Sequence, residues 1–195
     1  MRSPSPAASP SPDPSAEARA TALQAALTAA ASKVVDRIQQ EEAELYQKLS
    51  YFQKPERLDP NTYASIDEVL AWRKLLQDLA VKQDRVAALY ANAGRNLDAE
   101  LINAKVSAQI AQPFRNSVLD GFPWPTIQKK NQCFQRYIEA HAQLLNLYEK
   151  YWGSWDAGQP VKFRTTQLNA SYLKAKNDLL SAGKQLDEQY KAMSE

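Results

Sequence analysis

The segment LNASYLKAKNDLLSAGKQLDEQYKAM, residues 168–193, decides the fold class. Its apolar side chains recur in steps of three or four, at Leu168, Tyr172, Ala175, Leu179, Ala182, Leu186, Tyr190 and Met193. This spacing places them on one face of an α-helix. Similar lines run through residues 23–52, 66–108 and 127–155, and no alternation of strand length competes with them. The sequence therefore predicts an all-α protein.

Prolines divide the chain into four long stretches. Five of the 11 prolines lie near the N-terminus, and the other six fall at three junctions, residues 55–60, 113–125 and 160. Proline breaks helices, whereas the stretches between the junctions contain almost no breakers. We therefore expect four long helices in an antiparallel up-down bundle. Their expected bounds are about 16–54, 65–112, 126–156 and 162–193.

The expected bundle occupies residues 16–195 as a single domain. Residues 1–15 are rich in Ser, Pro and Ala, and they lack the apolar side chains that would offset the entropy of ordering them. We expect a disordered tail or tether there.

The lengths of the helices predict a surplus hairpin. The first two expected helices are longer than the last two, so the latter cover only part of them. Residues 37–82 are then expected to protrude as a hairpin, or to be drawn in by a bend in the second helix. The apolar side chains of this hairpin cover about half of the second helix's circumference. Such a face indicates an interface, with another protein or with a second copy in a homodimer.

Composition excludes several functional classes. The chain has 24 Lys and Arg against 22 Asp and Glu, a net charge of +2, which argues against a nucleic-acid binder. One Cys and one His exclude the clusters of these residues that hold zinc or iron. No phosphate-binding loop, serine-nucleophile motif or run of 18 apolar residues is present. We expect a non-enzymatic protein with no cofactor, no metal and no transmembrane segment.

His141 is the one residue of the expected core that has ligand chemistry. Glu139 lies two residues away, on another face of the helix, and the chain has no second His with which to build a di-metal site. We interpret His141 as a core histidine with a hydrogen-bond partner, and Cys133 as a small buried apolar residue.

Aromatic residues carry the strongest functional signal. The chain has four Trp, nine Tyr and five Phe, and the up-down arrangement sends many of them to one end of the bundle. Six are our candidate ligand- or partner-binding residues: Trp72, Tyr148, Tyr151, Trp152, Trp155 and Phe163. Tyr and Trp suit half-wet binding surfaces because they combine apolar area with a polar tip. The competing interpretation is that these rings cap the bundle core.

Three functional hypotheses follow. The first is a helical scaffold or interaction module that contacts another chain. The second is a small-ligand carrier with a pocket at the aromatic end of the bundle. The third, disfavoured by the mild charge bias, is a helical dimer that binds a membrane surface. The N-terminal tail indicates either the tether of an exported protein or a cytoplasmic regulatory tail with Ser-Pro phosphoacceptors, and we favour the tether.

Overall fold

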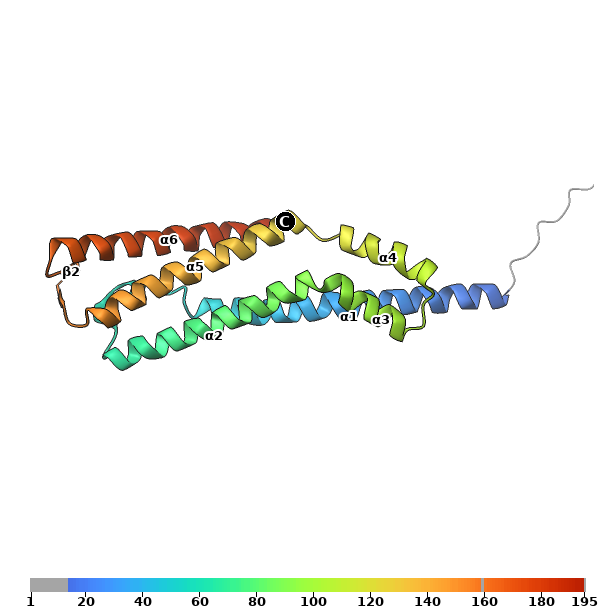
Figure 1. Cartoon of the computed structure of the whole chain (residues 1–195), viewed down its shortest axis with the longest axis horizontal. Coiled ribbons are helices and arrows are strands. Elements are labelled where there is room, and N and C mark those ends of the chain that lie inside the picture. The colour runs from blue at the N-terminus through green and yellow to red at the C-terminus, as the bar shows by residue number, and fades with distance from the viewer. Residues whose placement is uncertain (1–13, 159, 195) are drawn as a thin grey trace, which may run out of the picture. The chain divides into compact units, whose positions relative to one another are not determined.

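A computed structural model describes residues 14–158 and 160–194 (Figure 1). Within these residues the protein is all-α, with six α-helices, two short 3-10 helices and one pair of two-residue strands. The described residues form two compact units: residues 14–36 with 93–121, and residues 37–92 with 122–194. Residues 1–13 of the tail predicted for residues 1–15 lie outside the described residues. The other two residues belong to α1, which begins at Pro14.

The first unit contains residues 14–36 of α1 (Pro14–Ser50), together with α3 (Ala93–Asn103) and α4 (Ala108–Asp120). Its most buried apolar side chains are Ala30, Val34, Ala93, Leu97 and Leu101. Two ion pairs join its helices: Lys33 to Glu100 at 2.9 Å, and Arg115 to Asp98 at 3.0 Å. The α1 and α3 segments thus supply the apolar core of this unit.

The prediction of one helix over residues 65–112 is wrong, because the helix is interrupted there twice. α2 ends at Ala91, where the amide side chain of Asn92 donates to the carbonyl oxygen of Ala88 at 2.8 Å. α3 ends in a Schellman-type turn, with Lys105 at φ 57° and the N–H of Val106 bonded to the carbonyl of Leu101 at 3.1 Å. Glycine usually takes that left-handed position, so a lysine there gives no sequence signal.

The junction predicted for residues 113–125 is mostly helix. α4 runs from Ala108 to Asp120 and carries Pro113 inside it. Proline in the second turn removes one backbone hydrogen bond and leaves the rest of the helix intact. α4 therefore continues through the proline that was predicted to end a helix.

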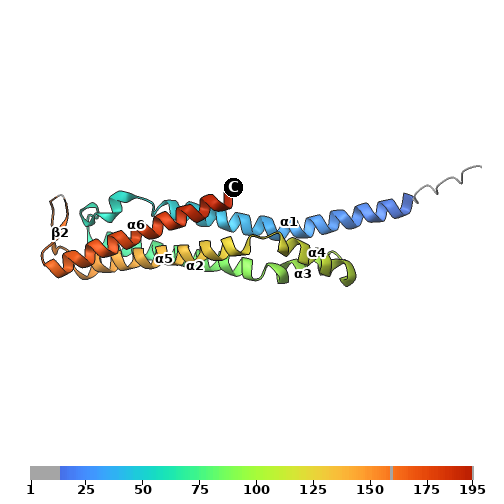
Figure 2. The same cartoon turned by 90° about the horizontal axis from the view of Figure 1, so that it is seen from above.

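The second unit contains residues 37–50 of α1, together with α2 (Ile66–Ala91), α5 (Trp124–Lys150) and α6 (Thr166–Ser194). α5 packs closely against both α2 and α6, and it runs antiparallel to α6 beside it (Figures 1 and 2). A continuous set of side chains at most 5% exposed forms the core: Leu45, Leu49, Phe52, Val69, Leu76, Leu79, Phe134, Leu144, Leu145, Tyr148, Leu179 and Leu186.

Residues 37–82 do not protrude as a hairpin, which was the first of the two arrangements predicted for them. Leu45, Val69 and Leu79 from this segment are completely buried, inside the core that α5 completes. The start of α5 lies beside the end of α2, where the ring of Tyr90 is 5.9 Å from Phe122 and 6.5 Å from Trp124. α5 therefore returns along the segment that was expected to stand alone.

Two predicted helix ends also differ. α1 ends at Ser50 instead of residue 54, and the 3-10 helices η1 (Pro55–Leu58) and η2 (Pro60–Thr62) follow. α5 ends at Lys150 instead of residue 156. Beyond it β1 (Trp155–Asp156) pairs antiparallel with β2 (Lys162–Phe163). Strands of two residues are too short for alternation to reveal them.

Candidate functional site

The predicted aromatic site forms one ring cluster in the second unit. The ring of Tyr148 lies 6.3 Å from Trp155 and 6.3 Å from Tyr172, and Phe163 lies 5.4 Å from Trp155. Trp152 meets Trp155 edge to face at 5.2 Å. Four of the six predicted site residues are thus brought together, with Tyr172 as an additional member.

Hydrogen bonds fix this cluster to the loop after α1. The hydroxyls of Tyr148 and Tyr172 both donate to the carbonyl oxygen of Leu58, at 2.7 and 3.0 Å. The indole N–H of Trp155 donates to the side-chain oxygen of Asn61 at 2.9 Å. Burial raises the pKa of the Tyr148 hydroxyl, so this group remains a neutral donor.

The remaining predicted site residues lie apart. Trp72 is buried and packs edge to face on Phe52 at 5.1 Å, under the guanidinium of Arg57. Tyr151 is half-buried, with the Lys150 ammonium 5.1 Å from its ring. Tyr148, Phe163 and Trp72 are core side chains, which favours the interpretation that the rings cap the core. A ligand role for the half-buried Tyr151, Trp152 and Trp155 stays a prediction.

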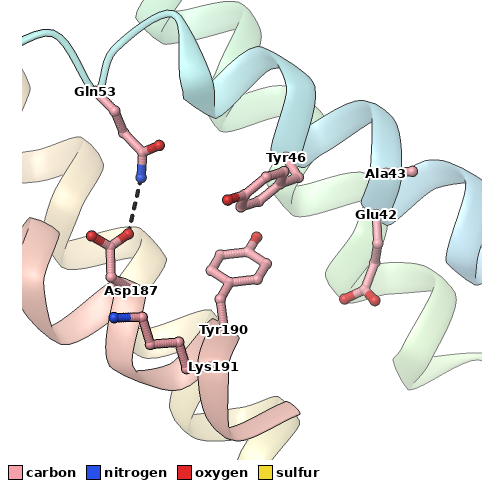
Figure 3. A pocket seen from close by; sticks show the side chains of 7 residues that line it. All are labelled: Glu42, Ala43, Tyr46, Gln53, Asp187, Tyr190 and Lys191. Atoms are coloured by element: carbon pink, nitrogen blue, oxygen red, sulfur yellow. Dashed lines mark hydrogen bonds between the residues drawn. The ribbon is translucent and has the colours of Figure 1, made fainter. Parts of the chain in front are cut away.

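A pocket of about 790 Å³ opens in the second unit between α1 and α6 (Figure 3). We call it the tyrosine pocket, and its lining residues are Glu42, Ala43, Tyr46, Gln53, Asp187, Tyr190 and Lys191. Tyr46 and Tyr190 project toward each other from the two helices, with ring centroids 5.2 Å apart and planes at 62°. Tyr46 is 51% exposed, so an aromatic surface faces solvent here.

One hydrogen bond crosses the space between the two sides of the pocket. The side-chain amide of Gln53 donates to the Asp187 carboxylate at 3.0 Å (Figure 3). Together with the tyrosine pair, it connects residues 46–53 to residues 187–190 in antiparallel order. The pocket is therefore lined from two segments that only the tertiary fold brings together.

No family model, curated protein or solved structure matches this chain significantly.

A buried ion pair lies behind the tyrosine pocket. Lys130 of α5 is completely buried, and its ammonium contacts the Glu42 carboxylate. The same ammonium lies 5.3 Å from the ring of Tyr90 and 5.8 Å from the ring of Tyr190. Burial lowers the pKa of Lys130 to about 8. The carboxylate and the two ring faces favour its charged form.

A second group of charges joins α1 to α2. The Lys82 ammonium bonds to Glu41 at 2.5 Å and also to Glu44, and Arg85 bonds to Glu41 at 2.6 Å. The hydrogen bonds that Lys82 donates to Glu41 and Glu44 raise its pKa. These side chains are committed to one another, which suits a structural role.

A smaller pocket of about 330 Å³ adjoins the tyrosine pocket and shares Gln53 and Asp187 with it. We call it the apolar pocket. Its apolar lining residues are Phe52, Pro55, Leu58, Tyr137, Leu179 and Leu180. Gly183, Lys54 and Lys184 also line it. The two pockets follow the same line between the end of α1 and α6.

His141 departs from its expected environment. It is 1% exposed, and neither ring nitrogen has a hydrogen-bond partner among the described residues. Its ring packs edge to face on Phe52 at 5.2 Å and on Tyr137 at 5.7 Å. Burial lowers its pKa to about 4. The expected partner is thus missing from the described part of the chain, whereas Cys133 is buried as predicted.

The described residues hold neither a metal-ligand cluster nor a membrane-spanning helix. No group of three or more His, Cys, Asp or Glu side chains there is placed to hold a metal ion. None of the described helices has the length and hydropathy needed to cross a membrane.

Sequence reasoning missed the residues that line the tyrosine pocket. Tyr46 is not among the six candidate aromatic residues, and Tyr190 was assigned to the apolar face of its helix. Gln53 and Asp187 carry no motif, and they meet across 134 positions of sequence. A pattern search along one helix cannot find a pair of this kind, because the signal lies in the pairing of two helices.

Proposed function

We propose that this protein is a non-enzymatic interaction module whose tyrosine pocket receives an amphipathic helix of a partner protein. The scaffold of this proposal is an antiparallel four-helix bundle formed by α1, α2, α5 and α6. The observation that carries it is the pair formed by the exposed Tyr46 and the half-buried Tyr190 in an open pocket of about 790 Å³ between two helices.

The chemistry of the pocket favours a protein segment as the occupant. Tyr46 offers a half-exposed ring, and Tyr presents large contact area with little loss of side-chain freedom. Gln53, Asp187 and Lys191 surround it with polar groups, in the pattern of an interface with an aromatic centre and a polar rim. A groove between two helices is also a common receptor for a third helix.

The charges around the pocket support binding over catalysis. Glu42 contacts the buried Lys130, and Asp187 accepts a hydrogen bond from Gln53. Each carboxylate is therefore already engaged by another side chain of this protein, whereas a general acid or base has to be within hydrogen-bond reach of a substrate proton.

A photocrosslinking experiment tests the proposal. A photoreactive phenylalanine replaces Tyr46 in the full chain, and the matched control carries it at Tyr51, which is 57% exposed and lies outside the tyrosine pocket. In an extract of the cell of origin, the variant at position 46 should crosslink to a helical segment of one partner that the control does not capture.

Two outcomes would contradict the proposal. Equal adducts from positions 46 and 51 would show that the pocket selects nothing. Adducts between two copies of this chain would assign the tyrosine pocket to self-association, which sedimentation over a range of concentrations would then register.

A further inference from the structure

Two aromatic residues, Phe52 and Tyr137, line the apolar pocket. The hydroxyl of Tyr137 donates to the carbonyl oxygen of Phe52 at 3.1 Å, so its polar atom is already bonded. Both rings also pack edge to face on His141, at 5.7 and 5.2 Å. These contacts hold Tyr137 and Phe52 in place, so this part of the lining does not have to form when a ligand arrives.

Gly183 keeps the α6 side of this pocket open. A Cβ atom placed there would lie 3.6 Å from the nearest ring carbon of Tyr137, which is an ordinary van der Waals distance. A methyl group therefore fits at this position, whereas a longer side chain would extend into the pocket. The pocket volume of about 330 Å³ lies at the lower end of the range for small-molecule sites.

The rim of the apolar pocket has surplus positive charge. Lys54 and Lys184 are exposed and line the pocket, and neither forms an ion pair with a carboxylate in the described residues. The one carboxylate of the rim, Asp187, accepts the hydrogen bond from Gln53. The lining thus combines six apolar residues with two cationic groups.

We propose that the apolar pocket binds a small amphipathic carboxylate, with its apolar tail on Phe52 and Tyr137 and its carboxylate beside Lys54 and Lys184. Octanoate, an eight-carbon carboxylate, is a probe of this class. This inference goes beyond the proposed partner binding, because it concerns a different pocket and a different class of ligand.

Three probes of equal chain length test the ligand class on the full chain by isothermal titration calorimetry. Octanoate should bind more tightly than 1-octanol, and octylammonium should bind most weakly. An exposed ion pair contributes up to about fivefold in affinity, so the double variant K54Q/K184Q should bind octanoate roughly tenfold more weakly. Its affinity for 1-octanol should stay unchanged. Equal binding of the three probes would overturn the anionic part of the proposal.

A pair of variants at Gly183 tests the location. Gly183→Leu should abolish octanoate binding because its side chain fills the pocket, and Gly183→Ala should retain it. Both replace a glycine inside a helix with a better helix former, and circular dichroism checks that each variant is folded. Octanoate binding that survives in Gly183→Leu would overturn the proposal, as would an absence of binding in the unmodified chain. Tyr46→Ala should leave octanoate binding unchanged.

Discussion

Replacement of His141 by leucine should make the stability of the protein less sensitive to acid. The His141 pKa is about 4 in the folded chain and 6.5 in an unfolded one. At pH 7 the imidazole is mostly neutral in both states and contributes little pH dependence. As the pH falls from 6.5 toward 4, only the unfolded state binds the proton, so the folded state loses stability. At pH 5 the loss amounts to about 2 kcal/mol.

Denaturant unfolding of both proteins at pH 7 and pH 5 measures this effect. Carboxylates that titrate over the same range are common to both, so the difference between the two free energies of unfolding isolates His141. When the pH is lowered from 7 to 5, the free energy of unfolding of His141→Leu should rise by about 2 kcal/mol relative to that of the unmodified protein. Removal of two unpaired buried nitrogens should also stabilise the variant at pH 7, by about 1 kcal/mol. A difference that stays constant between the two pH values would refute the burial of an unpartnered imidazole.

Three further substitutions test the packing of the second unit by denaturant unfolding at pH 7. Gly183→Ala should raise the free energy of unfolding by about 1 kcal/mol, because the site is helical and has room for a methyl group; a destabilised variant would contradict that room. Lys130→Met should lower the free energy of unfolding by about 3 kcal/mol because it leaves Glu42 without its cation. Adding Glu42→Gln should recover most of that loss, and additive losses would show that the pair is not coupled. Tyr148→Phe should cost about 1 kcal/mol, since the Tyr172 hydroxyl still bonds the same carbonyl, and the double variant with Tyr172→Phe should cost more than the sum of the single changes.

Helical periodicity predicted the fold class, because it depends on local chemistry. The line from Leu168 through Leu179 to Leu186 lies in α6, and the last two side chains are buried as expected. The end of α3 was not predicted because Lys105 adopts a left-handed backbone conformation that is unusual for lysine. The continuity of α4 through Pro113 was not predicted for the opposite reason: proline usually ends a helix, and here it lies inside one.

Partner choice between helices was the harder part of the prediction. The predicted helix lengths left residues 37–82 uncovered because residues 93–112 were assigned to the same long helix as residues 65–92. In the structure those residues turn back after Asn103 as α3 and α4, and α5 then begins beside Tyr90 of α2. A four-residue turn with no glycine thus separates α3 from α4, where the sequence predicted one continuous helix. Sequence patterns identify the apolar face of each helix and do not specify which faces pack together.

The same limit applies to the candidate site. Aromatic density drew attention to Trp152 and Trp155, which lie in the cluster fixed to the loop after α1. The tyrosine pocket instead depends on one aromatic residue from each of two helices, and each of them looks ordinary within its own helix. Its polar rim uses Gln53 and Asp187, residue types that are common on any helix surface.

The affinity of the crosslinked partner for two single variants tests the proposed interface most directly. Tyr46→Ala removes an exposed ring from the tyrosine pocket, and Tyr51→Ala removes an equally exposed ring outside it. We predict at least tenfold weaker binding for Tyr46→Ala, about 1.4 kcal/mol, and a change of less than about twofold for Tyr51→Ala. Unchanged binding by Tyr46→Ala, or an equal loss in both variants, would contradict a partner site between α1 and α6.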